Sequence, residues 1–567
     1  MLLKNRHYWQ INMKASPFLP TLPSLLVDRG IPLIDRDLSW LQFNDRVLSE
    51  SRRENNPLLE RAKFLAISAS NLDEFFMIRF SSLQKEIGVA EKKSAPDGES
   101  YRRRRVRDSV LENVAKFGAK QQESLELLAV DLEAVGYWLP RTTAIGHPLH
   151  EIGAQVFREK ILDRLPPAER FSLGRVAGTE NLELITVFQA DESDSRSDLW
   201  IRIPKNLPPL FLAPVPDRVG VQAVFFLDDL IASHLPQALG RHEKPGLLRV
   251  TRDGDVEVEL VQEDSESIPD VVRSSVKRRE RGRPMRLQYA GNARPELLEA
   301  CAAVLKLRPS QVIPAYASLV LPGLWILANQ PAEPPLVHST LRPLTPKSFL
   351  LPGLFEKLKS KDYLLHHPYD AFEAFLEWMR AAAVDKKVVA ISVTLYRTDA
   401  RSPLIAALKE AAHAGKKVKV AVELRARFDE LRNLGVAEEL RAAGVEVIYG
   451  FGKLKLHAKI SLVERIEDGA PQLYTHLSTG NYNSATARQY TDLAILTAHP
   501  EIGQDALKFF AAISEERIPS GFKRLVVAPT RLHHRLLQLI EAETEAARSG
   551  STDSRIVAKV NALVDPV

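Results

Sequence analysis

Apolar residues recur every three to four positions over the first third of the chain, which predicts amphipathic helices between residues 35 and about 135. Ser39 is the expected N-cap of the first helix, because its hydroxyl can accept a hydrogen bond from an early backbone N–H group. Pro57 opens a second helix, and the capping-box spacing from Ser70 opens a third. A longer helix is expected over residues 107–136. The region therefore predicts a helical domain.

The pattern becomes mixed between residues 138 and 343. Residues 199–204 and 250–260 carry the side-chain pattern of strands, and an Asp-Gly pair inside the second run is a hairpin signal. Prolines are frequent over residues 331–346, which we interpret as a linker into the next domain.

Apolar, β-branched runs alternate with helical segments from residue 344 to about residue 525. The expected strands are 387–396, 418–424, 445–449, a run that includes His457, 472–478 and 493–497. This succession favours an α/β sandwich with a largely parallel sheet.

Residues 525–567 repeat the opening of that cycle, with a strand, an amphipathic helix and a second strand from Ile556. The apolar face of the helix carries Leu532, Leu536, Leu537 and Ile540. These are too few strands for an independent sheet. We therefore expect the helix to pack on residues 344–524, on another subunit, or on a separately made C-terminal piece.

The patterns together predict a multidomain α+β protein. The expected segments are an N-terminal extension (1–32), a helical N-terminal domain (33–137), a mixed α/β head domain (138–343), an α/β domain (344–524) and the truncated start of a second α/β domain (525–567). A length of 567 residues agrees with several cores rather than one.

Composition narrows the class of protein. The hydrophobic content of 45% and charged content of 26% are typical of a soluble globular chain. The net charge of +5 is too small for a duplex-binding protein, so no nucleic-acid partner is expected. Basic clusters lie at 102–107 and 273–286, and either one alone is best interpreted as solvated surface. The two together are compatible with a polyanion channel. Cys301 is the single cysteine, which favours a reducing, cytoplasmic compartment. No run reaches the roughly 18 apolar residues of a transmembrane segment, although peripheral membrane association stays open.

His457 and Lys459 stand two positions apart, at the start of an apolar, β-rich run. Alternate residues of a strand share one face, so we expect the imidazole and the ammonium to point the same way. A buried lysine is costly without an anionic partner, and a phosphate would supply that partner. A neutral imidazole can attack phosphorus and hold it as a phosphohistidine. The pair therefore favours phosphoryl transfer, with both residues catalytic.

Other candidates are phosphate-binding residues. The string Ser-Thr-Gly-Asn-Tyr-Asn, which includes Asn481, offers backbone N–H groups and an amide to a phosphate. Arg397 and Arg427 each follow an expected strand, where ligands collect in parallel α/β sheets. Arginine suits bidentate phosphate binding there. Ordinary ion pairs with Asp399 or Asp429 are an equally open interpretation.

Six strings, in order from about residue 33 to the end of the chain, resemble the long-chain polyphosphate kinase family. They are Asp37-Leu-Ser-Trp-Leu-Gln-Phe-Asn-Asp-Arg-Val-Leu, Asn71-Leu-Asp-Glu-Phe-Phe-Met-Ile-Arg-Phe, Thr394-Leu-Tyr-Arg-Thr-Asp, Val422-Glu-Leu-Arg-Ala-Arg-Phe-Asp-Glu, Lys455-Leu-His-Ala-Lys and Ser478-Thr-Gly-Asn-Tyr-Asn. A single string would be weak, whereas six in register are specific.

The resemblance implies a helical N-terminal domain, a head domain and two phospholipase D-like α/β catalytic domains. It implies reversible transfer of the terminal ATP phosphate to polyphosphate, with Mg²⁺, through a phosphohistidine at His457. Asn44 and Tyr490 match nucleotide-binding positions, although pattern alone makes Asn44 a helix-surface residue and Tyr490 a core residue. Arg397 and Arg427 match positions associated with Mg²⁺. Because arginine has no lone pair for a cation, we expect both to hold phosphates that hold the metal.

The sequence also departs from the family pattern. Lys453 replaces a usual glycine, Val436 replaces a common aromatic, and the chain ends at Val567, inside the match to the second catalytic domain. Three functions stay open: an ATP–polyphosphate kinase; a truncated, inactive or complementation-dependent polyphosphate-binding homologue; and a phospholipase D-type phosphodiesterase. Against the last, Glu464 stands where that class has aspartate. The expected partners are ATP, ADP and polyphosphate, with a homo-oligomer and a separate C-terminal domain in trans both compatible with the sequence.

Overall fold

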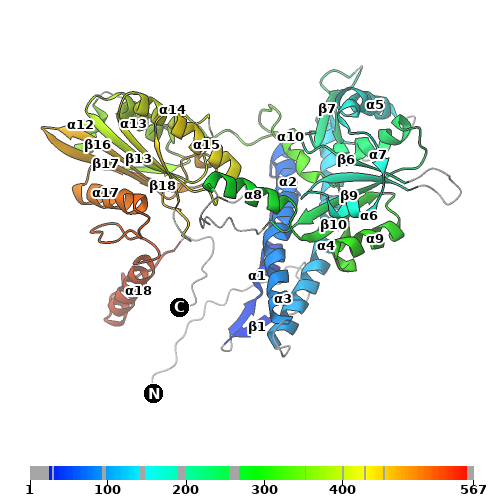
Figure 1. The fold of residues 1–567 in the computed structure, drawn as a ribbon, viewed down its shortest axis with the longest axis horizontal. Coiled ribbons are helices and arrows are strands. Elements are labelled where there is room, and N and C mark those ends of the chain that lie inside the picture. The colour runs from blue at the N-terminus through cyan, green and yellow to red at the C-terminus, as the bar shows by residue number, and fades with distance from the viewer. Residues whose placement is uncertain are drawn as a thin grey trace. The chain divides into compact units, whose positions relative to one another are not determined.

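The computed structural model describes two compact units, which we treat separately (Figure 1). The first comprises residues 1–256 and 277–339, and the second comprises residues 257–276 and 340–567. The described residues are 25–28, 31–91, 98–140, 147–189, 198–216, 218–254, 267–350, 353–398, 401–426, 429–450 and 454–558. In this described part of the chain, every helix is too short or too polar to span a bilayer.

The first unit begins with an antiparallel hairpin and a helical layer. The hairpin is β1 (Leu25–Asp28) with β2 (Ile31–Ile34), where a loose extension was predicted up to about residue 30. The helices are α1 (Arg36–Glu50), α2 (Leu58–Phe75), the π-helix η1 (Phe76–Phe80), α3 (Ser81–Glu91) and α4 (Gly98–Ala134).

Two predicted helix starts in this layer are wrong. Asp35, not Ser39, caps α1, because its carboxylate accepts hydrogen bonds from the backbone N–H groups of Asp37 and Leu38. The helix start predicted at Ser70 lies inside α2, where the Ser70 hydroxyl donates to the Ala66 carbonyl at 3.1 Å. The side chain therefore bonds within the helix instead of capping a new one.

The rest of the first unit contains two sheets. One has the strand order β11-β10-β9-β5-β6-β4 and the other β3-β8-β7. The strands are β3 (Tyr137–Trp138), β4 (Glu169–Arg170), β5 (Leu184–Phe188), β6 (Leu199–Ile203), β7 (Leu210–Pro214), β8 (Gln222–Phe226), β9 (Gly246–Arg252), β10 (Pro284–Gly291) and β11 (Val312–Pro314). The predicted strand at 199–204 is confirmed, whereas most of the hairpin predicted over 250–260 lies outside the described residues.

Short helices connect and flank these strands. They are α5 (Pro148–Lys160), η2 (Leu162–Arg164), α6 (Leu173–Ala177), α7 (Leu227–Ala238), α9 (Pro295–Leu305), η3 (Pro309–Gln311), η4 (Leu321–Gly323) and α10 (Leu324–Ala328), and α8 (Ile268–Glu280) crosses the division between the units.

A charged cluster lies buried in the first unit. The Asp73 carboxylate, at the end of α2, accepts hydrogen bonds from Arg249 Nη2 at 2.6 Å and Arg286 Nη2 at 2.5 Å. The Arg286 guanidinium also lies over the ring of Phe76, 4.4 Å from its centroid. Burial alone would raise the pKa of Asp73, but the two arginines outweigh it and lower that pKa. Arg286 is 1% exposed, so this member of the predicted basic channel is a core residue.

The second unit is built on a seven-stranded sheet with the order β12-β18-β17-β16-β13-β14-β15. The strands are β12 (Tyr363–His367), β13 (Val388–Leu395), β14 (Lys417–Val422), β15 (Glu446–Tyr449), β16 (Ile460–Glu467), β17 (Ala470–Ser478) and β18 (Asp492–Thr497). Only the pairs β13–β14 and β14–β15 are parallel, and the other four pairs are antiparallel. The prediction of a largely parallel sheet is therefore wrong.

Helices cover both faces of this sheet (Figure 1). They are α11 (Lys347–Leu350), α12 (Leu354–Ser360), α13 (Glu373–Val384), α14 (Pro403–His413), α15 (Glu430–Ala442), α16 (Ser484–Ala487) and α17 (Pro500–Ser514). Alternation along β16 shows the two cores, because Leu462 packs in the cluster of α17, whereas Val463 packs with α13 and α14. Val436, at the position that is commonly aromatic, is a buried residue of α15.

The last described element is α18 (Leu532–Arg548), which is helical as predicted. None of its residues is buried, and Leu536 is 50% exposed, so the predicted packing on residues 344–524 is absent from the described chain. The strand expected before α18 is not formed, and residues 556–558 form no strand either.

Candidate functional site

Several chain segments meet at one edge of the seven-stranded sheet. The strands β13 and β14 end there at Leu395 and Val422. Because β16 runs antiparallel to β13, its first residue, Ile460, lies at the same edge. The end of β17 joins them, since Leu477 pairs with Ile460. The sheet thus gathers side chains from segments that are far apart in the sequence.

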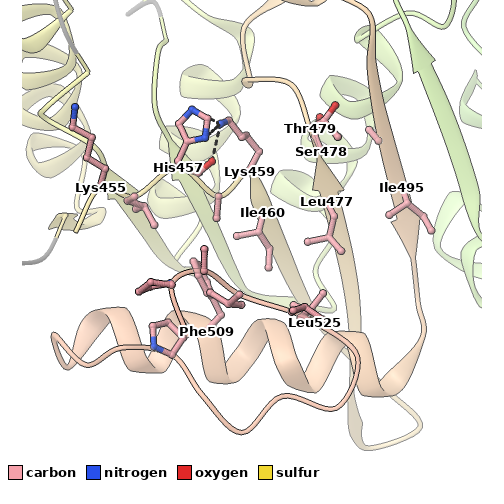
Figure 2. A pocket seen from close by; sticks show the side chains of 18 of the residues that line it. Lys455, His457, Lys459, Ile460, Leu477, Ser478, Thr479, Ile495, Phe509 and Leu525 are labelled. Carbon is pink, nitrogen blue, oxygen red and sulfur yellow. Dashed lines mark hydrogen bonds between the residues drawn. The ribbon is translucent and has the colours of Figure 1, made fainter. Parts of the chain in front are cut away.

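His457 and Lys459 converge at this edge, as the sequence predicted (Figure 2). Lys459 Nζ lies 3.0 Å from His457 Nδ1 and 3.1 Å from Nε2, and it donates to the His457 carbonyl at 2.7 Å. The two residues are not on a strand, however, because β16 begins only at Ile460. An extended loop segment brings them together, and His457 stays partly exposed whereas Lys459 is buried.

Electrostatics at the pair favour a neutral imidazole. Burial and the neighbouring Lys459 ammonium lower the pKa of His457 below its ordinary value, with the Glu423 carboxylate acting in the opposite direction. Burial lowers the pKa of Lys459 to about 8, although the Asp492 carboxylate raises it. Near pH 7 the site therefore presents a neutral imidazole beside a lysine that is still mostly protonated.

Two further residues at the site escaped the sequence analysis. The Tyr396 ring meets the His457 ring edge-on, with 4.8 Å between centroids, and Lys459 Nζ lies 5.3 Å from the Tyr396 centroid. Glu423, fully buried just after β14, accepts a hydrogen bond from the Leu456 N–H at 2.5 Å. Both residues directly follow apolar, β-branched runs, and a polar residue at a strand end was the available signal.

The turn that contains Asn481 packs beside the pair. The Ser478 N–H donates to the Lys459 carbonyl at 3.0 Å, and the Thr479 hydroxyl donates to Asp492 at 2.8 Å. Gly480 is required here, because a Cβ would lie 2.5 Å from an Asp492 carboxylate oxygen. Asn481 Oδ1 is buried with no donor among the described residues. The turn therefore places small residues and backbone N–H groups next to the loop of His457.

The arginine candidates have different outcomes. Arg397 Nε forms an ion pair with Asp429 at 3.0 Å, which is one of the two pairings left open by the sequence. Its side chain is 44% exposed, so it can exchange that carboxylate for another anion. Arg427, Asp399 and Lys453 lie outside the described residues.

The two nucleotide-binding candidates also differ from their patterns. Tyr490 is 62% exposed rather than in the core, so its ring is free to stack on a planar group. Asn44 is fully buried in the first unit rather than on a helix surface. Its amide donates to the Ser68 carbonyl at 2.9 Å and accepts from Asn71 at 3.0 Å. The described contacts of Asn44 are therefore those of a core residue.

A cavity of about 750 Å³ adjoins the pair in the second unit. His457, Lys459 and Ser478 lie at one end of its lining. Aliphatic side chains such as Ile460, Leu477 and Ile495 project from the sheet into the rest of the cavity, where Figure 2 shows Phe509 and Leu525. The polar end suits a phosphate, whereas the aliphatic walls do not.

No group of three or more histidine, cysteine, aspartate or glutamate side chains is arranged to hold a metal ion within the described ranges. Mg²⁺ prefers carboxylate, phosphate and water oxygens. The described residues therefore do not form an all-protein magnesium site.

Comparison with known proteins agrees with this fold. Three family models match the chain: the polyphosphate kinase N-terminal domain over residues 33–138, the middle domain over 150–327, and C-terminal domain 1 over 353–519. They cover most of the chain, with the third containing His457.

Individual relatives give the same result. A polyphosphate kinase from Exiguobacterium sibiricum is 33% identical over 94% of this chain and 74% of its own length. One from Streptomyces coelicolor is 36% identical over 94% of this chain and 71% of its own length. The crystal structure of polyphosphate kinase from Porphyromonas gingivalis matches with a TM-score of 0.74 and 29% identity, over 92% of this chain and 76% of that one. The chain therefore belongs to the polyphosphate kinase family.

Proposed function

We propose that the protein transfers the terminal phosphate of ATP to inorganic polyphosphate, reversibly, through a phosphohistidine on His457. The observation that carries the proposal is a partly exposed imidazole, kept neutral by burial and by an adjacent lysine, at the ligand-binding edge of an α/β sheet. Family membership supplies the two substrates, because relatives that are 33% and 36% identical over 94% of this chain are named polyphosphate kinases.

The chemistry proceeds in two displacements. A ring nitrogen of neutral His457 attacks the γ-phosphorus of ATP, a P–N bond forms, and the bond from γ-phosphorus to the β,γ-bridging oxygen breaks to release ADP. A terminal oxygen of polyphosphate then attacks the phosphohistidine, the P–N bond breaks, and the imidazole is regenerated. The Lys459 ammonium offsets negative charge on the transferring phosphoryl oxygens in both steps. The reverse sequence makes ATP from ADP.

Mg²⁺ is proposed to enter with the nucleotide rather than as a resident ion. The described residues lack an acidic ligand cluster, and Mg²⁺ commonly binds nucleotide phosphates while keeping several waters. Arg397 and Arg427 are proposed to bind the phosphate oxygens, since arginine donates hydrogen bonds and cannot ligate a cation.

The remaining substrate contacts are proposals of different strength. Tyr490 has an exposed ring for stacking, and Asn481 lies in the turn beside Lys459. Asn44 has the weakest support, because its amide is already hydrogen bonded inside the first unit. A role in nucleotide binding would require Asn44 to exchange these partners.

The decisive experiment is phosphoryl labelling. The chain is incubated with γ-labelled ATP and Mg²⁺, and protein-bound label is tested for the acid lability and base stability of a phosphohistidine. His457→Ala should take up no such label, whereas His413→Ala, on the exposed end of α14, should label like the parent protein. Full labelling of the His457→Ala variant would overturn the assignment.

A further inference from the structure

The described part of the segment that carries His457 lies just before β16, whose named strand begins at Ile460. One backbone bond already reaches this segment, because the Ser478 N–H donates to the Lys459 carbonyl at 3.0 Å. On its C-terminal side the segment is held by Thr394, whose hydroxyl donates to the Ala458 carbonyl at 2.8 Å and accepts from the Ile460 N–H at 3.0 Å. The N-terminal side, which immediately precedes His457, needs another anchor.

Glu423 and Arg425 provide that anchor. The Leu456 N–H donates to Glu423 Oε2 at 2.5 Å, and Arg425 Nη2 donates to the Leu454 carbonyl. The backbone on both sides of Lys455 is thus held by one side-chain pair. Because Leu456 is bonded directly to His457, this contact sets the direction in which the imidazole leaves the chain.

The pair is itself immobilised. The Glu423 carboxylate also accepts from the Arg425 backbone N–H at 2.7 Å and from Arg425 Nε at 3.1 Å. The Glu423 backbone N–H donates to the Leu395 carbonyl at 2.9 Å, and its carbonyl accepts from Asn433 at 2.9 Å. These bonds tie the end of β14 to the end of β13, so the carboxylate is fixed against the sheet.

Stability alone gives a weak reason for such a pair. A buried ion pair often contributes little net stability compared with apolar side chains of the same volume, because both charges lose their hydration. A carboxylate with no exposed surface that bonds the residue before a nucleophile is better explained by orientation.

We infer that Glu423 and Arg425 are positioning residues, which hold the backbone of residues 454–456 so that His457 is presented beside Lys459 and against Tyr396. This inference rests on the proposed function, since His457 must be the phosphoryl acceptor for its orientation to affect turnover. Neither residue is proposed to touch the transferred phosphate.

The main variant is Glu423→Gln, which keeps the volume and one acceptor oxygen but removes the charge that holds Arg425. Misplacing a reacting group by about 1 Å can lower a rate about 100-fold. We therefore expect single-turnover labelling of His457 to slow by about 10- to 100-fold, with the KM for ATP changed less than about 3-fold. Glu439→Ala, which removes an exposed partner of Lys409, should label at the parent rate.

Two further measurements separate positioning from loss of structure. Glu423→Asp should restore part of the labelling rate, because it returns the charge with a shorter reach. The titration of His457, followed by NMR of protein with ¹³C-labelled histidine, should move to lower pH in Glu423→Gln, since the carboxylate that raises this pKa is gone. Circular dichroism and thermal unfolding confirm that each variant is folded.

The outcomes distinguish the two proposals. If a folded Glu423→Gln protein labels at the parent rate and its His457 titration is unchanged, the positioning inference is wrong. If the parent protein takes up no label on His457, the proposed function fails instead, and the titration alone decides whether Glu423 acts on that side chain.

Discussion

In the first unit, the buried guanidinium groups of Arg249 and Arg286 share the carboxylate of Asp73, whereas in the second unit the buried ammonium of Lys459 forms no ion pair with a described carboxylate. The guanidinium groups of Arg249 and Arg286 thus have a carboxylate partner inside the protein. Lys459 has only the carbonyl and ring of His457 as hydrogen-bond partners in the described chain, and burial lowers its pKa to about 8. The comparison separates cations that are paired inside the fold from a buried cation that we propose to meet an anionic substrate.

The largest expected effect is a loss of stability, at the buried ion pairs of Asp73 in the first unit. Asp73→Ala would leave two buried guanidinium groups without their carboxylate, which typically costs about 3–5 kcal/mol of unfolding free energy. Glu112→Ala is the matched control, because Glu112 pairs with Lys116 and their side chains are 68% and 57% exposed. That change should cost at most about 1 kcal/mol. Urea unfolding of both variants checks the prediction, and equal losses would remove the contrast between the sites.

Lys459→Met should lower the labelling rate without lowering the free energy of unfolding. Removing a donor that stabilises transition-state charge typically costs about 2.7–4 kcal/mol of activation free energy, or 100- to 1000-fold in rate. Single-turnover labelling by ATP should fall by that factor. Unfolding free energy should not fall, because methionine avoids burying an ammonium. Lys409→Ala, on the exposed side of α14, serves as the control. A Lys459→Met protein that labels normally but unfolds easily would make Lys459 a structural cation like Arg286.

Arg397 should give an intermediate effect. Loss of a charge-assisted hydrogen bond to phosphate weakens binding by about 1.5–3 kcal/mol, so Arg397→Ala should weaken ATP or polyphosphate binding in calorimetry. Arg397→Lys should also weaken binding, because the planar fork of donors is lost. Arg432→Ala is a close control, since Arg432 pairs with the same Asp429 carboxylate at 3.0 Å but is 65% exposed. Equal effects of Arg397→Ala and Arg432→Ala would indicate that Arg397 serves only its ion pair.

The smallest effect is a pH dependence of labelling between pH 7 and 9. With a pKa of about 8, the protonated fraction of Lys459 falls about 10-fold over this interval, equivalent to about 1.4 kcal/mol. The labelling rate should fall accordingly, and Lys459→Met should show no alkaline decrease. On the acid side, the pKa of His457 is lowered. The labelling rate should therefore stay level down to a pH below the ordinary pKa of histidine. A parent rate that stays level to pH 9 would contradict the assigned role of Lys459.

Titration of Lys459 should make the free energy of unfolding depend on pH. Between the folded pKa of Lys459, about 8, and its ordinary value of 10.5, the unfolded chain binds more protons than the folded one. Stability contributed by this group therefore rises with pH across that window. The lysine is a net cost to folding at neutral pH, as expected for a residue retained for a ligand.

The sequence predicted that His457 and Lys459 lie together, but by an incorrect geometry. The two-residue spacing correctly placed His457 and Lys459 together, although a loop rather than a strand does so. Glu423 was missed because its role depends on Leu456, which is 33 positions away in the sequence. The burial of Asn44 was equally non-local, since its partners Ser68 and Asn71 belong to the next helix. Side-chain contacts between distant segments cannot be read from local periodicity.

The error in sheet topology had a local signal that went unused. Asp468 and Gly469 join β16 to β17, and both have positive φ, at 49° and 79°. An Asp-Gly pair between two apolar runs is typical of a tight hairpin, which makes the following strand antiparallel. The helices between the earlier strands predicted the parallel pairs β13–β14 and β14–β15 correctly, because a crossover connection needs a dozen or more residues.

The edge strand β12 has a consequence for synthesis of the chain. Its one strand partner in the described sheet is β18, and about 125 residues separate His367 from Asp492. At a ribosomal rate of about 5–20 residues per second, β12 waits roughly 6–25 s for its partner to be made. During that time its unpaired backbone N–H and C=O groups can form hydrogen bonds with a strand of another chain. The second unit is therefore expected to finish folding only after β18 has left the ribosome, and early β12 is a natural client for a chaperone.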